Sequence, residues 1–443
     1  MANERMMCEA SPWKLLLTMS LPTIVVMIVN VLYNMADVYF IGQTGDTNAV
    51  AVISLAAPVF SAISACHTLI GFGGSTAISI ALGEGNKDKV RRYSAFVVWF
   101  PVLLSAVIMV ILFACMPGLL QLLGTDADTF PHAQAYLRIL TCGTPFMLLS
   151  GAIGNSIRAD GDAKSAMLAS MAGTIVNIVL DPLFILHFGW GSGGAALATV
   201  IGYVISMVLA LRIARRKEAW SLSPKDFTLR PEISLRVLSL GLPMAGGTLL
   251  MSFAHIFSNR LLVAYGNQAV AARSVAGKIS MLIPMILMGV CMGIQPAVSY
   301  AYGRRDLRRL KEILLDTGIC ATAIAVLFTV LTFVFRRALV TAFLPDPSIL
   351  DLGMQMVIGC IIATPVYGIY QLCSTFLQGT GRVSYATVTS LLRQGLVYVP
   401  VNFLMNAAFG LNGLIYASAV TDILSTIIGV VLCILQARRL MAA

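Results

Sequence analysis

An all-α polytopic membrane protein is the fold class that the sequence predicts, and three observations point to it. Hydrophobic residues make up 58% of the 443 residues and charged residues only 11%, whereas charged residues make up about 25% of an average soluble domain. The apolar residues gather in long runs, and about 20 apolar residues suffice to cross a bilayer. The two halves of the chain also resemble one another. We therefore expect twelve transmembrane helices in two six-helix, pseudo-symmetric lobes around a central cavity.

The apolar runs place the predicted helices one by one. The first six are expected at residues 15–41, 48–82, 91–116, 130–157, 164–188 and 192–214. The last six are expected at residues 234–263, 269–302, 311–335, 348–378, 383–409 and 412–437. Several of these segments are longer than a bilayer is thick, so we expect tilted or kinked helices, or helices that extend beyond the membrane surface.

An internal repeat appears when the chain is compared with itself. One and the same offset places Gly83 on Gly303 and Gly161 on Gly381. A nearly constant offset across both halves indicates duplication, and an even number of helices in each copy gives the copies the same orientation in the membrane. The predicted domains are an N-lobe at 1–216, a cytoplasmic linker at 217–233 and a C-lobe at 234–443.

The basic residues predict the orientation of the chain. Most of them fall in the loops on one side of the predicted helices, including Lys87, Arg158, Arg216 and Arg304. Because basic loops stay in the cytoplasm, both termini are expected there, in a multi-pass protein of the cytoplasmic (inner) membrane. The net charge of +10 thus comes from basic residues in the loops, and we expect a lipid bilayer and no nucleic acid as a partner. A monomer is expected.

The cysteines and histidines do not form the spacings of a metal or redox site. Nine cysteines include no CxxC pair, and the four histidines show no HxxxH or HExxH spacing. The sequence also lacks a recognisable constellation of nucleophile, base and oxyanion donors. We therefore expect a protein that is not an enzyme, with no catalytic residues and no cofactor apart from a coupling ion.

One acidic residue, Asp37, lies within the first predicted helix. An Asp at the centre of a membrane helix costs about 3 kcal/mol on insertion scales, so such an acid marks a functional site by default. Asn30, Tyr33 and Asn34 lie seven, four and three positions before it, and they share roughly one side of the helix with it. The alternative is an acid near a helix end that reaches the lipid headgroups.

A second polar group lies in the fifth and sixth predicted helices. Asn177 and Asp181 are four residues apart and share a helix face, and Pro182 follows the acid. Counted from the outer ends of their helices, Asp37, Asp181 and Thr199 lie at similar depth. Oxygen ligands of this kind suit a hard cation such as Na⁺, or a proton. A structural hydrogen-bonded cluster, with Pro182 serving only as a kink, is the alternative.

These residues and several longer motifs resemble the multidrug and toxic compound extrusion transporters, and the resemblance covers nearly the whole chain. The motifs are Leu21-Pro22 with Asp37 fifteen residues after the proline, GFGGSTAISIALGEGN from Gly71, Asn177-x3-Asp181-Pro182, GAALAT ending at Thr199, and GIQPAVSYAYGRRD from Gly293. The resemblance implies that Asp37, Asn177, Asp181 and Thr199 form a cation or proton site in the N-lobe, able to hold Na⁺, with Tyr33 beside it.

The second half departs from part of that family. Some members carry an acid in the seventh helix, whereas this chain has His255 and no carboxylate there. An ion pair between Arg393 and Asp422 is the simpler interpretation of the polar residues in the last helices. The candidates for a substrate cavity are Tyr33, Asn30, Asn34, Asn155, Met147, Met171, His255, Tyr367, Gln371, Arg393 and Asp422.

The resemblance implies a secondary active antiporter that exports cationic, amphiphilic drugs or toxic organic compounds in exchange for Na⁺ or H⁺. Its expected partners are therefore small organic cations and the coupling cation. The alternative is a flippase of a lipid-linked precursor, because distant relatives share the two-lobe architecture. A phosphate headgroup would call for several arginines in the cavity, and the N-lobe acids would repel it.

Overall fold

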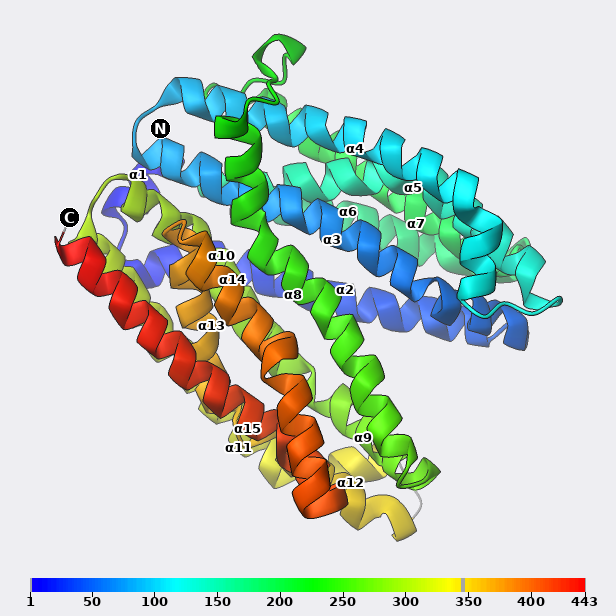
Figure 1. Ribbon diagram of the computed structural model, residues 1–443. Helices are drawn as coiled ribbons and strands as arrows, with labels where there is room; N and C mark the ends of the chain where they lie inside the picture. The colour runs from blue at the N-terminus through cyan, green and yellow to red at the C-terminus, as the bar shows by residue number, and fades with distance from the viewer. Residues whose placement is uncertain (1, 344–346, 443) are drawn as a thin grey trace. The chain divides into compact units, whose positions relative to one another are not determined.

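A computed structural model describes residues 2–343 and 347–442 of the chain, and this part is built from helices and connecting turns, without a strand (Figure 1). Within it, eleven helical runs are long and apolar enough to cross a membrane. The last run, Val383–Met441, has 59 residues and is broken at Gly410, where φ is 57° and ψ is −135°. It therefore supplies two of the predicted crossings, and the expectation of twelve membrane helices is confirmed.

The helices of the first half follow the predicted order. A short helix that was not predicted, α1 (Ala2–Glu9), comes before the first span. It is followed by α2 (Pro12–Gly42), α3 (Thr47–Gly83), α4 (Lys87–Leu122), α5 (Thr129–Ile157), the 3₁₀ turn η1 (Arg158–Asp160), α6 (Ala163–Pro182), the π-turn η2 (Leu183–His187) and α7 (Gly191–Arg215).

The helices of the second half are more often interrupted. They are α8 (Pro231–Val263), α9 (Asn267–Ser280), α10 (Leu282–Gly303), α11 (Leu307–Phe343), α12 (Pro347–Ile361), α13 (Thr364–Gly379), α14 (Val383–Leu391), the π-turn η4 (Leu392–Leu396) and α15 (Tyr398–Ala442). The predicted helix at 269–302 is thus divided at Met281, and the one at 348–378 is divided before Thr364. A proline in the first turn of α13 accounts for the second break, because a proline has no N–H to continue the preceding helix.

Local sequence signals explain where several helices begin and end. The side chains of Asn86 and Asp162 accept hydrogen bonds from the backbone N–H groups of Lys89 and Ser165 and so cap α4 and α6. Gly161 and Gly381, which are equivalent positions of the two repeats, both end a helix in the left-handed region, with φ of 78° and 67°. The repeat seen in the sequence is therefore repeated in backbone geometry, because glycine adopts this conformation without strain.

The chain forms two compact units, each with its own packed helices. The first unit contains residues 25–245 together with the N-terminal residues up to Met7, and the second contains Cys8–Ile24 and the residues from Gly246 onward. In the first unit, α5 packs against α3, α4 and α7, and α6 packs against α7 (Figure 1). An apolar cluster fills the space among α3, α4 and α5.

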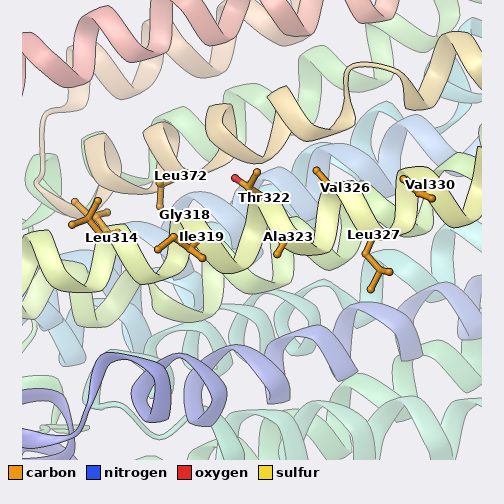
Figure 2. Close-up of a pocket in the computed structure, with 10 residues that line it drawn as sticks. Leu314, Gly318, Ile319, Thr322, Ala323, Val326, Leu327, Val330 and Leu372 are labelled. Carbon is orange, nitrogen blue, oxygen red and sulfur yellow. The ribbon is translucent and has the colours of Figure 1, made fainter.

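In the second unit, α13 packs against α10, α11 and α15, and α12 packs against α9 and α15. The outer face of α11 bears a shallow groove with an almost wholly apolar lining, shown in Figure 2. The groove runs from Leu314 to Val330 along α11, with Leu372 of α13 at its edge. Apolar side chains on such a face suit contact with lipid tails, because the helix satisfies its own backbone hydrogen bonds.

The first halves of α2 and α8 pack differently from the rest of those helices. In the first unit, a Cβ added to Gly241 of α8 would lie 1.7 Å from the carbonyl oxygen of Leu69 of α3. In the second unit, a Cβ added to Gly293 of α10 would lie 2.5 Å from Cα of Ser20 of α2. Glycine thus allows backbone-to-backbone contact at both places. The compact units therefore differ from the predicted N-lobe 1–216 and C-lobe 234–443 by these two half-helices.

The segment predicted as a polar linker, 217–233, is packed onto the first unit. Lys217 Nζ lies 2.8 Å from Asp160 Oδ2 and 3.4 Å from Asp162 Oδ2. The buried indole of Trp220 donates a hydrogen bond of 3.1 Å to Asp160 Oδ1. The segment is therefore held to the turn between α5 and α6 by one cation, two carboxylates and one aromatic ring.

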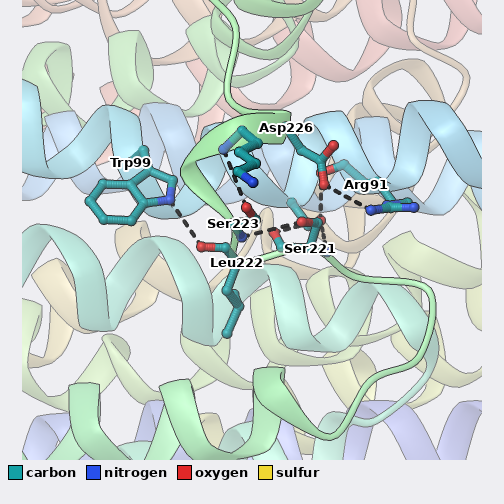
Figure 3. A network of polar contacts seen from close by, with 8 residues as sticks. Arg91, Trp99, Ser221, Leu222, Ser223 and Asp226 are labelled. Carbon is teal, nitrogen blue, oxygen red and sulfur yellow. Dashed lines mark hydrogen bonds and ion pairs between the residues drawn. The ribbon is translucent and has the colours of Figure 1, made fainter.

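The same segment is also fixed to α4, as Figure 3 shows. Trp99 Nε1 donates to the carbonyl oxygen of Leu222 at 3.1 Å, and Arg91 Nη2 lies 3.1 Å from Asp226 Oδ2. Hydrogen bonding from the Ser221 hydroxyl, with help from Arg91, holds the pKa of Asp226 below its usual value. These contacts make the connection an ordered part of the first unit, which the polar composition did not predict.

Candidate functional site

Three helices of the first unit bring the predicted cation-site residues together. Asp37 lies on α2, Asn177 and Asp181 lie one turn apart on α6, and Thr199 lies on α7. Asn177 Nδ2 lies 3.5 Å from Asp181 Oδ1 and 3.4 Å from Thr199 Oγ1. The Tyr33 hydroxyl, on the Asp37 face of α2, lies 3.2 Å from Thr199 Oγ1. The i, i+4 spacing and the similar depth that the sequence indicated therefore correspond to real contacts.

The two carboxyl groups of the site lie next to one another. The Asp37 carboxyl group is within hydrogen-bonding reach of the Asp181 carboxyl group and of the Tyr33 hydroxyl. Asp181 has no exposed surface, and Asn177 is 3% exposed. Two adjacent carboxylates in such surroundings repel one another, so both are ionised only when a cation compensates their charge; otherwise one of them holds a proton.

Several oxygen atoms of the site have free lone pairs. Among the described residues, Asp37 Oδ1, Asn177 Oδ1 and Asp181 Oδ2 are buried and have no hydrogen-bond partner. Buried acceptors without a donor are rare in folded proteins and are costly unless a ligand fills them. Acceptor oxygens are the ligands that hard cations prefer. The residues therefore fit Na⁺ or a proton.

A transition-metal site does not fit the same residues. In the described part of the chain, no group of three or more His, Cys, Asp or Glu side chains gathers closely enough to hold a metal ion. The donor set here consists of two carboxyl groups, an amide and a hydroxyl, all of them oxygen ligands when they face a cation. Oxygen ligands favour Na⁺ over soft or borderline metals.

Two tyrosines belong to the surroundings of the site and were not predicted from the sequence. Tyr136 of α5 and Tyr203 of α7 interact electrostatically with the Asp37 carboxyl group. Tyr203 lies four residues after Thr199 on α7, so its spacing offered a signal that could have identified it. Tyr136 gave no such signal, because a single tyrosine in an apolar run most often packs as a core residue.

The remaining candidates in the first half lie in varied surroundings. Met147 is fully buried in the apolar cluster of α3, α4 and α5. Asn155 accepts a hydrogen bond from Arg158 and packs against Gly71 of α3. Met171 is partly exposed on α6, and Asn30 is partly buried on α2. The side chain of Asn34 lies outside the described residues.

In the second unit, the expected ion pair between Arg393 and Asp422 forms. Arg393 Nε lies 2.6 Å from Asp422 Oδ1, and its guanidinium lies over the ring of Tyr367. The Tyr367 hydroxyl donates to Gln371 Oε1 at 3.4 Å. Four of the predicted candidates are thus in one cluster. The side chain of His255 lies outside the part of the chain that the structure describes.

Comparison with known proteins agrees with this architecture. The sequence profile of the MatE family matches residues 22–183 and 243–404, one segment in each half of the chain. The multidrug export protein MepA of Staphylococcus saprophyticus is 27% identical over 433 residues, covering 98% of this chain and 96% of that protein.

Solved structures give the same result for the fold. The outward-facing conformation of a multidrug resistance MATE family transporter of the MOP superfamily superimposes with a TM-score of 0.91 at 24% identity, covering 99% of this chain and 98% of the other. A MATE in the bent conformation also gives a TM-score of 0.91, at 23% identity over 100% and 99% of the two chains. With both halves matched, this chain belongs to the MatE family, the multidrug and toxic compound extrusion transporters.

Proposed function

We propose that this protein is a secondary active antiporter that exports cationic, amphiphilic compounds in exchange for Na⁺ or H⁺. The observation that carries the proposal is the pair of adjacent buried carboxyl groups, Asp37 and Asp181, with unpaired acceptor oxygens around them. Membership of the MatE family and the similarity to MepA, a multidrug export protein, support it.

The site itself suggests how coupling works. When a cation lies between Asp37 and Asp181, it cancels their repulsion and draws α2 towards α6. When it leaves, the two carboxylates repel one another, or one takes up a proton, and α2 is free to move. Asn177 and Thr199 hold the cation through neutral oxygen atoms, and the Tyr33 hydroxyl connects Thr199 to the helix that carries Asp37. Exchange follows if the exported compound binds the state without the coupling cation.

A flippase of a lipid-linked precursor receives no support from this geometry. Its headgroup carries phosphate, which arginine side chains would have to hold. The site in the first unit is acidic, and Arg393 in the second unit is already paired with Asp422. The exported compound is therefore expected to be a cation and not an anionic lipid.

The experiment that tests the proposal is transport in proteoliposomes. Purified protein is reconstituted in vesicles, and the movement of ethidium is followed after an inward or outward gradient of Na⁺ or of pH is imposed. We expect ethidium to move against the direction of one of the two ions. Ethidium movement that responds to neither gradient, in vesicles that hold correctly inserted protein, would disprove antiport.

The orientation in the membrane forms a further part of the proposal: a multi-pass monomer of the cytoplasmic membrane with both termini in the cytoplasm. The test is cysteine labelling, in a cysteine-free background, at the exposed positions Lys87 and Asp128. Asp128 makes no side-chain capping bond, so its replacement perturbs α5 little. A membrane-impermeant maleimide added to intact cells is expected to label position 128 and not position 87. The reverse pattern contradicts this topology.

A further inference from the structure

The guanidinium group of Arg393 is held inside the second unit by one carboxylate and two aromatic rings. Arg393 Nε donates to Asp422 Oδ1 at 2.6 Å. The guanidinium carbon Cζ lies 4.3 Å from the centre of the Tyr367 ring and 5.6 Å from the centre of the Tyr370 ring. A carboxylate beside aromatic faces is the arrangement by which proteins recognise organic cations, through charge and through cation–π attraction.

The aromatic part of this cluster is fixed by contacts that do not involve the arginine. The rings of Tyr367 and Tyr370 are stacked, with centres 5.9 Å apart and an angle of 21° between their planes. The Tyr370 hydroxyl donates to the carbonyl oxygen of Thr389 at 3.0 Å, and the Tyr367 hydroxyl donates to Gln371. The rings therefore keep their places if Arg393 moves, and a site that is already formed binds its ligand at a lower entropic cost.

Arg393 lies in a part of the helix that is less regular than its surroundings. It belongs to the π-turn η4, Leu392–Leu396, between α14 and α15, and single π-turns occur often at functional sites. The side chain of Arg393 is 22% exposed and that of Asp422 is 13% exposed. The ion pair is therefore not fully enclosed by protein.

Comparison of the two repeats shows that the ion pair is not required by the fold. The offset that relates Gly161 to Gly381 places Arg393 on Gly173, and the offset one residue shorter that relates Gly194 to Gly413 places Asp422 on Tyr203. In the first unit Gly173 lets the two helices touch, because a Cβ added to it would lie 2.2 Å from the carbonyl oxygen of Gly202. The same pair of helices thus meets through bare backbone in the first unit and through two charged side chains in the second. A charge pair inside a bundle often stabilises no more than apolar packing of similar volume, so its presence calls for another reason.

We propose that Asp422, Tyr367 and Tyr370 form a binding site for an organic cation, and that Arg393 fills it as a tethered ligand which the bound cation displaces. This inference rests on the proposed export of cations and names where such a cation binds in the second unit. The favoured ligands are cations with delocalised charge or aryl groups, such as guanidinium, aromatic ammonium and aryl phosphonium ions, because they match both the carboxylate and the stacked rings. The first unit, with Gly173 and Tyr203 at the corresponding positions, has no equivalent ion pair.

The test removes the Arg393 side chain and supplies a free guanidinium compound in its place. Purified wild type, R393A, the double variant R393A/D422N and R382A are heated in detergent with increasing methylguanidinium at millimolar concentrations. R382A is the matched control, since Arg382, which precedes α14, also bonds a residue of α15 but through an amide, Gln436 Oε1, at 2.9 Å. Methylguanidinium is expected to raise the unfolding temperature of R393A only, because a ligand stabilises the state that binds it.

Binding of tetraphenylphosphonium provides a second measurement. We expect R393A to bind it about tenfold more tightly than wild type, equivalent to about 1.4 kcal/mol, and R393A/D422N to lose the gain. Equal responses of R393A and R393A/D422N, or an equal response of R382A, would overturn the inference. Since neither measurement uses an ion gradient, both are independent of whether the protein transports against one.

A variant that does not fold is also informative. R393Q, which keeps much of the side-chain length without the charge, serves as the second variant and is compared with R393Q/D422N in the same way. Recovery of folded R393A or R393Q only in the presence of methylguanidinium supports a cation site. Failure to recover either variant with or without it would show that the arginine is purely structural, and the proposal would be wrong.

Discussion

Replacing either Asp37 or Asp181 by Asn is expected to abolish ion-coupled export while leaving the protein folded and inserted. Each substitution removes one of two adjacent negative charges, so the cation loses a ligand and the repulsion that drives the change of state disappears. Insertion does not suffer, because a neutral amide enters a membrane helix more readily than a carboxylate. The loss of transport is expected to reach about 100-fold, near the upper end of typical coupling factors.

The measurement is ethidium transport by purified variants in proteoliposomes under the gradient that drives the wild type. D88N is the matched control, since Asp88 is exposed in the first turn of α4 and the substitution removes the same charge outside the site. We expect D88N to transport like the wild type. Normal rates in both D37N and D181N would show that these carboxylates are structural and that the coupling cation binds elsewhere.

The second large effect concerns competition between the exported compound and the coupling cation. Cation binding at Asp37 and Asp181 is expected to lower the affinity for tetraphenylphosphonium by about 5- to 150-fold, the range that coupling free energies of about 1 to 3 kcal/mol produce. By linkage, the organic cation weakens binding of the coupling ion by the same factor. The measurement is equilibrium binding across a Na⁺ titration and, separately, across a pH titration. An affinity that changes with neither ion would exclude competition in the first unit.

Pro22 provides a way to separate binding from movement. It lies inside α2, just before the point at which the chain passes from the second compact unit to the first. A proline within a helix removes one backbone hydrogen bond and favours a kink there. P22A is therefore expected to stiffen α2 and to reduce turnover more than affinity for tetraphenylphosphonium. An equal loss in both quantities would assign Pro22 to the binding site and not to the movement.

The functional assignments differ in how far the sequence alone supported them. Asn177 and Asp181 were joined by their i, i+4 spacing, and Thr199 was added by counting depth along α7; the structure places all three in contact. Helical periodicity makes such predictions reliable, because side chains four positions apart share a face in any α-helix. Tyr136 was not predicted, since no periodicity relates it to Asp37.

In the second unit, the sequence predicted the ion pair but not the aromatic rings around it. The pairing of Arg393 with Asp422 was expected, because two opposite charges within a membrane bundle are stabilised by meeting. The two tyrosines around the guanidinium were not expected as a cage. Their positions depend on how α13 is rotated against η4 and α15. A contact between helices cannot be predicted from the residue spacing within one helix.

The sequence by itself determined the class of the protein, the number of membrane helices, the repeat and the family, because these follow from apolar run lengths and from a constant offset along the chain. Only the tertiary structure decided that the first halves of α2 and α8 pack in different compact units from the rest of these helices, and that the segment 217–233 is held on the first unit. The physical reason is that hydropathy specifies burial in lipid or protein but not the packing partner. That choice is made by local shape, such as the bare backbone at Gly241 and Gly293, and by hydrogen bonds between residues far apart in the chain.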